Sequence, residues 1–109
     1  MEKIKVIIKR PDEKAGHVTW ISNTLANLQR TVDGPIEVVK IGNSGLLMIC
    51  NEEGKIRGLE RNFIMGTVPF HDIIVGTVIL CGQDGEEFGD APIDMKTWKF
   101  MLNKWGNEL

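Results

Sequence analysis

The hydrophobic pattern of the chain centres on three apolar segments between residues 36 and 82. They are Ile36–Ile41, Leu46–Cys50 and Ile73–Cys81, and Gly, Asn and Asp residues separate them. Segments this rich in Val, Ile and Leu are typical of strands in the interior of a β-sheet. Leu46–Cys50 contains no polar residue, so both of its faces should be buried, which predicts a central strand. Gly42–Gly45 predicts a hairpin turn, because Gly and Asn tolerate positive φ.

The amino-terminal segment Glu2–Arg10 shows the alternation of a strand with one buried face. The alternating residues are Ile4, Val6 and Ile8 on one face and Lys3, Lys5 and Lys9 on the other. This period of two predicts a dry face and a wet face, and it places Ile7 on the wet face. Val18–Ile21 should form a short extended segment.

Two helices are predicted. The first should span Asn23–Asp33, because apolar residues recur at spacings of three and four, and Gly34 should supply the left-handed C′ residue that ends it. The second should begin after an N-cap at Asp94 and end at Gly106. Its apolar face carries Trp98, Met101, Leu102 and Trp105.

Two stretches lack a clear period. Lys55–His71 is long for a structureless loop in a compact domain, so we expect it to be functional or to carry its own packing unit. It leads into a fourth strand, Asp72–Cys81, in which Gly76 indicates a bulge or a close approach by another group. Gln83–Asp94 is acidic and predicts a solvated turn ahead of the closing helix.

Together these elements predict one α+β domain over residues 1–109, with the order β-α-β-β-loop-β-α. The sheet should be mixed and four-stranded, with its first two strands parallel through a right-handed crossover. Both helices should pack on one face. The opposite face then needs a cover, which is either the Lys55–His71 loop or a second copy of the chain in a homodimer.

Charge and hydropathy exclude several partners. The net charge is −2 and the pI is near 5.7, which argues against a general nucleic-acid binder because such a protein needs a basic face. Lys3, Lys5 and Lys9 are the only basic cluster, and lysines on an edge strand also discourage strand pairing. We expect no signal peptide and no membrane span, and therefore a cytoplasmic protein.

Catalytic chemistry has little support in the sequence. The candidate metal ligands lack C-x-x-C and H-x-x-x-H spacing, and no glycine-rich phosphate loop is present. Cys50 and Cys81 end apolar segments, which predicts buried, reduced and unreactive thiols. If their strands are antiparallel neighbours, a disulfide is geometrically excluded. We therefore expect no cofactor, no metal and no enzymatic activity.

A binding surface is the remaining hypothesis. Mixed charges and aromatic residues gather on and around the long loop. The candidate surface is Asn51, Glu53, Arg57, Arg61, Asn62, Phe63, Phe70 and Asp72. A solvated loop held by local ion pairs is the alternative interpretation of the charges. The three tryptophans are either hot spots for a partner or, for Trp98 and Trp105, the inner face of the second helix.

Several motifs resemble one family. They are Asn51–Leu59, Asn62, Asp72–Thr77, Thr24–Gln29 and Ile36–Val39, together with the closing helix. These residues are similar to a family of small proteins catalogued as domain of unknown function 3846, found in bacteria, especially Firmicutes, and in their phages and mobile elements. The resemblance implies no activity. This sequence differs from its relatives at Leu59–Asn62, where they tend to carry prolines before the Asn. Its segment before the fourth strand is also longer than theirs.

Two functions follow as hypotheses. The first is a small non-catalytic module, encoded by a phage or mobile element, that binds a protein partner through the long loop and inhibits a host or defence factor. The second is a protein that binds or sequesters a small, nucleotide-like ligand near Gly76, with Trp20 or Phe63 stacking on it.

Overall fold

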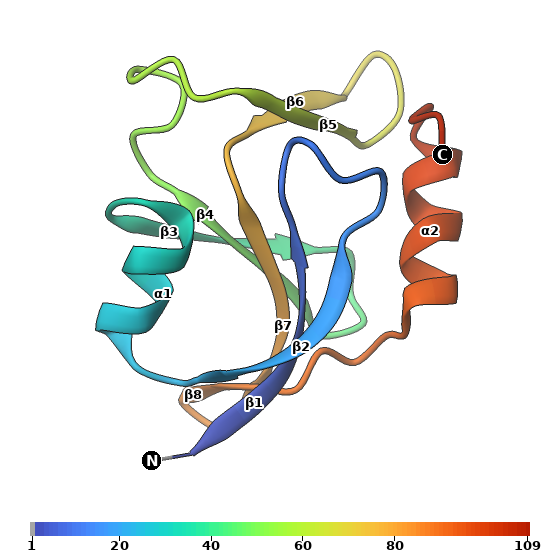
Figure 1. Cartoon of the computed structure of the whole chain (residues 1–109). Coiled ribbons are helices and arrows are strands. Elements are labelled where there is room, and N and C mark those ends of the chain that lie inside the picture. The colour runs from blue at the N-terminus through green and yellow to red at the C-terminus, as the bar shows by residue number, and fades with distance from the viewer. Residues whose placement is uncertain (1) are drawn as a thin grey trace.

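The computed structural model describes residues 2–109 and shows an antiparallel sheet at the centre of the molecule (Figure 1). Its strands are β1 (Lys3–Lys9), β2 (His17–Ser22), β3 (Ile36–Ile41), β4 (Leu46–Asn51), β7 (Val78–Asp84) and β8 (Glu87–Gly89). They lie in the order β2-β1-β7-β4-β3, and β8 pairs with the end of β7 beyond the part that pairs with β1. The central strand β4 is buried on both faces, as its composition predicted.

Four further elements surround this sheet. They are the helices α1 (Leu25–Val32) and α2 (Met95–Lys104) and the strands β5 (Arg61–Met65) and β6 (Asp72–Val75). The two strands form a separate antiparallel hairpin. The fold is therefore α+β, but the prediction of a mixed four-stranded sheet is wrong. Within residues 2–109 every strand pair is antiparallel, and β7 and β4 lie between β1 and β3, which have no parallel contact.

Much of the error in the predicted number of strands lies in the two stretches without a clear period and in the predicted strand between them. The predicted loop Lys55–His71 contains β5, and the predicted strand Asp72–Cys81 is two strands that belong to different sheets. The chain turns between them at Gly76, where φ is +74° and a Cβ atom would lie 2.9 Å from Leu59 Cδ1. Gly76 thus provides the close approach predicted for it. The acidic segment Gln83–Asp94 likewise contains β8.

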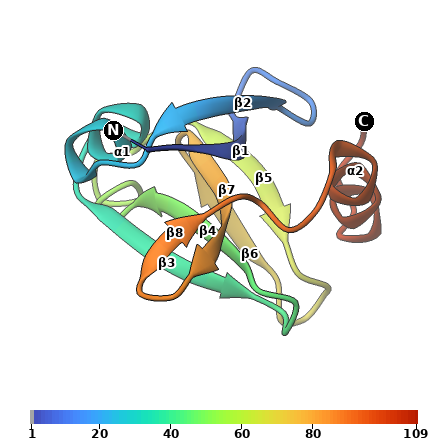
Figure 2. The ribbon, with the colours of Figure 1, turned by 90° about the horizontal axis from the view of Figure 1, so that it is seen from below.

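The helices lie on opposite faces of the central sheet, as both views show (Figures 1 and 2). On one face, Ile49 and Ile79 pack with Leu28 of α1. On the other, Met48 and Leu80 share a cluster with α2 and the β5–β6 hairpin. The prediction that both helices cover one face is wrong. Of the two covers predicted for the other face, the Lys55–His71 segment contributes through Phe63, together with α2. Both faces find cover within one chain, which explains why β4 and β7 are apolar on both sides.

The cover by α2 and the β5–β6 hairpin also buries residues of β1 that were predicted to face water. Ile7 and Lys9, predicted on a wet face, are only 1% and 2% exposed, because α2 and the hairpin lie over that end of the strand. The helix caps follow the sequence more closely. Thr24 and Asp94 accept hydrogen bonds from the backbone N–H groups of Asn27 and Thr97. The left-handed residue that ends α1, however, is Asp33 with φ of +65°, not Gly34.

Candidate functional site

Asn51, a predicted member of the binding surface, is a buried structural residue. Its Nδ2 donates to the carbonyl oxygens of Val32 at 3.1 Å and of Asp33 at 3.0 Å, which satisfies the open end of α1. Its Oδ1 accepts from the backbone N–H of Glu53 at 2.7 Å. Because all of these partners belong to the same chain, the side chain fixes the turn after β4 and is not free to contact a ligand.

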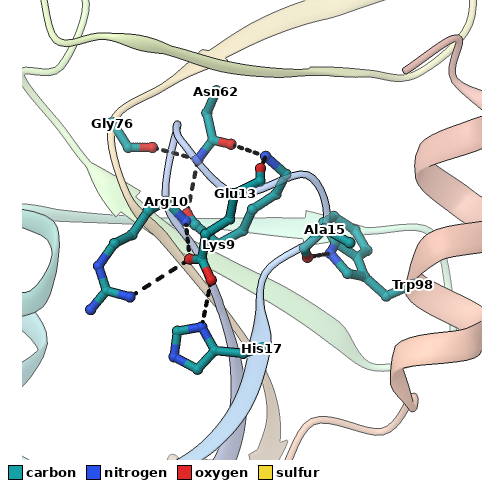
Figure 3. Close-up of polar contacts among 8 residues, drawn as sticks. All are labelled: Lys9, Arg10, Glu13, Ala15, His17, Asn62, Gly76 and Trp98. Atoms are coloured by element: carbon teal, nitrogen blue, oxygen red, sulfur yellow. Dashed lines mark hydrogen bonds and ion pairs between the residues drawn. The ribbon is translucent and has the colours of Figure 1, made fainter. Parts of the chain in front are cut away.

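Asn62 is equally committed to the fold (Figure 3). Its Nδ2 donates to the carbonyls of Lys9 at 2.9 Å and Gly76 at 2.7 Å, and its Oδ1 accepts from the Lys9 ammonium at 2.6 Å. Lys9 Nζ also donates to the Glu13 carbonyl at 2.8 Å. Burial lowers the pKa of Lys9, although Glu13 and Asp12 act to raise it. Of its three hydrogens, one thus holds the hairpin to β1 and a second holds the loop after β1.

The loop after β1 is fixed by its own polar contacts, also drawn in Figure 3. Glu13 accepts from the Arg10 N–H at 2.9 Å and lies 2.8 Å from His17 Nδ1. Burial acts to raise the pKa of Glu13, but these two hydrogen bonds and the charge interactions with His17 and Arg10 together leave that pKa below its ordinary value. The Trp98 indole donates to the Ala15 carbonyl at 2.9 Å, which ties the same loop to α2.

Phe63 lies in the core and not on the surface. It is 3% exposed, meets Trp98 edge-on with ring centroids 5.5 Å apart, and stacks on Trp105 at 6.3 Å. Trp98 and Trp105 therefore form the inner face of α2, the second of the two interpretations of the tryptophans. Trp20 lies apart on the edge strand β2 and is 56% exposed. Of the two residues proposed to stack on a nucleotide, Phe63 is buried and Trp20 is exposed.

The remaining predicted surface residues are exposed but do not form one patch. Arg57 donates to the carbonyl and carboxylate of Asp33, and Asp72 pairs with Lys55 at 2.6 Å. Ion pairs this exposed contribute little to stability. The others, Glu53, Arg61 and Phe70, lie at different points along the segment from β4 to β6.

A hollow of about 240 Å³ lies between β6 and the β3–β4 hairpin, and we call it the β6 groove. Its apolar walls are Val39, Met48, Cys50, Ile56, Met65, Ile73, Ile74 and Val75. Its charged residues are Glu37, Glu52, Lys55 and Asp72, three acids against one base, and Asn51 completes it. Figure 2 shows β6 on the β3 side of the small hairpin, with α2 on the far side. An apolar hollow with a charged rim is the usual form of a recognition site.

Cys50, in the wall of this groove, is a poor nucleophile. Burial first, and then the neighbouring Glu37 carboxylate, raise the pKa of its thiol to about 11. Its Sγ lies 3.9 Å from a Glu37 carboxylate oxygen. The pKa of Cys81, buried on the opposite face of the sheet, is raised to about 12 by burial alone. Both cysteines are free and buried, as predicted.

Sequence reasoning found Asn51 and Asp72 but missed the other residues of the groove, because its walls come from strands distant in sequence. The one available signal was the apolar triplet Phe63–Met65 followed by Gly66, which is a short strand with a turn residue after it.

In residues 2–109, no three His, Cys, Asp or Glu side chains gather closely enough to hold a metal ion. Neither described helix has the length and apolar content needed to cross a membrane.

Comparison with known proteins places the chain in a family. The family model described as a domain of unknown function, DUF3846, matches residues 4–103. The chain belongs to this family. The DUF3846 match runs from β1 into the last turn of α2, so it includes both walls of the β6 groove, and it confirms the resemblance drawn from the sequence motifs. No curated protein and no solved structure matches the chain.

Proposed function

We propose that this DUF3846 protein is a small protein-binding module that holds a segment of its partner in the β6 groove. The groove itself is the observation that carries the proposal: apolar side chains from β3, β4 and β6 line an open hollow with a charged rim. The hollow of about 240 Å³ is smaller than most small-ligand pockets, which measure about 300–1,000 Å³.

Exposed apolar residues at both ends of the hairpin extend this surface. Ile56, in the turn before β5, is 92% exposed, and Val68 and Phe70, in the turn between β5 and β6, are 81% and 91% exposed. Figure 1 shows the two turns at opposite ends of the hairpin. Ile56 belongs to the groove wall, whereas Val68 and Phe70 lie outside it. A partner that spans both turns would cover these residues together with the groove.

The charges favour a basic segment in the groove. The carboxylates of Glu37, Glu52 and Asp72 face only one ammonium, that of Lys55. Complementary charge guides the approach of a partner and selects among partners. We further propose that a phage or mobile element encodes this module and that its binding inhibits a host or defence factor.

Selection from a random-peptide display library tests this function. We expect enrichment of peptides that combine apolar and basic residues, and a loss of affinity of about tenfold in Ile56→Ser, which removes an apolar contact at the groove. Phe100→Ser is the matched control, since Phe100 is 60% exposed but lies on α2, outside the groove. No enrichment, or equal effects of the two substitutions, would sink the proposal.

A further inference from the structure

We infer that the partner segment binds as an added β-strand along the outer edge of β6, pairing with the backbone of Ile73. This inference rests on the proposed function and specifies its mode of recognition. In strand addition, main-chain hydrogen bonds supply affinity and alternate side chains supply specificity.

The first step concerns the opposite edge of the hairpin, which is closed. Asn107, just after α2, accepts from the backbone N–H of Ile64 at 2.8 Å and donates to the carbonyl of Ile64 at 2.8 Å. Its amide thereby occupies both backbone groups that a neighbouring strand would use at Ile64, in the middle of the paired part of β5. A third bond, from Nδ2 to the carbonyl of Leu102 at 3.0 Å, fixes this side chain to the end of α2.

The second step concerns the register of β5 and β6. Ile64 lies directly opposite Ile73. Because the N–H and C=O of Ile64 are turned toward Asn107, this is a non-hydrogen-bonded pair, and in such a pair both residues direct their backbone groups away from each other. The N–H and C=O of Ile73 therefore point out of the hairpin on the β6 side. Among residues 2–109, β5 is the only strand paired with β6.

The third step assigns side chains. Ile74 faces the core, and Asp72 lies on the same side of the strand because side chains alternate. A residue of the added strand beside Ile74 would enter the apolar groove, and its neighbour two positions away would lie beside Asp72 on the acidic rim. The recognised chemistry is thus an extended segment with an apolar residue and a Lys or Arg separated by one residue.

The other open edges fit this role less well. β2 and β3 are also edge strands, but β3 contributes only two residues to the groove, Glu37 and Val39, whereas all of β6 lines it. A second hollow, of about 400 Å³, follows the same edge of β6 and is lined by Lys55, His71, Asp72, Ile73 and Val75. An extended segment therefore finds space along the whole length of β6.

The test uses the synthetic form of the peptide most enriched from the random library. Ile73→Pro removes the outward N–H, and an edge strand tolerates proline where that group faces solvent. We expect at least a tenfold loss of affinity, against less than about threefold for Ile73→Ala, which keeps the N–H. In the unmodified protein, saturating peptide should slow hydrogen exchange of the Ile73 amide at least tenfold.

The outcomes separate the two proposals. Peptides that depend on Ile56 but leave Ile73 exchange unchanged, and that bind Ile73→Pro normally, would overturn strand addition and leave the groove as the binding site. Absence of any enriched peptide would overturn both. If Ile73→Pro fails to fold, peptides N-methylated at single positions replace it: strand addition requires one or more positions where methylation abolishes binding, and uniform tolerance contradicts it.

Discussion

At the scale of single residues, two side-chain amides predicted to lie on a binding surface instead join parts of the fold. Asn51 joins the end of α1 to the turn after β4, and Asn62 joins β1, β5 and the Gly76 turn. Nothing local distinguishes such residues from exposed ones, because their carbonyl partners come from other parts of the chain. The polar residues of the predicted surface were therefore read as solvent-facing, although two of them are internal connectors.

Replacing Asn51 by Ala should destabilise the protein by about 2–4 kcal/mol, since the Val32 carbonyl and the Glu53 N–H would lose their partner; the Asp33 carbonyl would keep its bond from Arg57. Urea unfolding followed by tryptophan fluorescence measures this loss. Asn103→Ala is the control, because Asn103 is exposed on α2, and it should change stability by no more than about 0.5 kcal/mol. A similar small change for Asn51→Ala would show that its hydrogen bonds are dispensable.

At the scale of elements, most segments with a clear period were predicted correctly. Ile36–Ile41 matches β3, Asp94 caps α2, and Gly106 follows the end of that helix. The errors lie in short strands at points where the chain passes from one sheet to the other. β6 and β7 are nearly continuous in the sequence and equally apolar, so only the conformation at Gly76 separates them. Strand order was not predictable for a related reason: an apolar run shows that a strand is buried, but not which neighbours it pairs with.

The break at Gly76 can be tested by comparing two glycines. Gly76→Ala should cost about 2 kcal/mol, because the new Cβ meets Leu59 and the residue keeps a positive φ. Gly85→Ala should cost about 1 kcal/mol, since Gly85 has φ of +63° but open space around it. Chemical denaturation of both variants measures the difference. Equal costs would mean that Leu59 moves aside freely and does not define the corner.

At the scale of the whole molecule, the buried layers lie on both sides of one central sheet. Cys50 belongs to the layer under α2 and the hairpin, and Cys81 to the layer under α1. The two thiols therefore report on the two halves of the core. Because each folded pKa lies above the ordinary thiol value of 9.0, the folded state holds these protons more tightly than the unfolded state does.

Stability should consequently fall as the pH rises above about 9, as unfolded thiols lose protons that folded ones keep. We expect a loss of about 2–3 kcal/mol between about pH 8 and pH 10 from both thiols together. The double variant Cys50→Ala, Cys81→Ala should show a correspondingly smaller fall in urea unfolding. Lys9, with its lowered pKa, acts in the opposite sense, but it is common to both proteins. Identical pH profiles would contradict the assignment.

The amide of Asn107 also limits how far molecules of this protein can associate through the β5–β6 hairpin. A two-stranded hairpin with both edges open can pair on each side, and successive copies then add without limit into a fibre. With β5 closed by Asn107, pairing through this hairpin uses β6 alone and stops at two partners. One side chain beyond the last helix thus leaves the hairpin with a single edge, that of β6, for pairing with another strand.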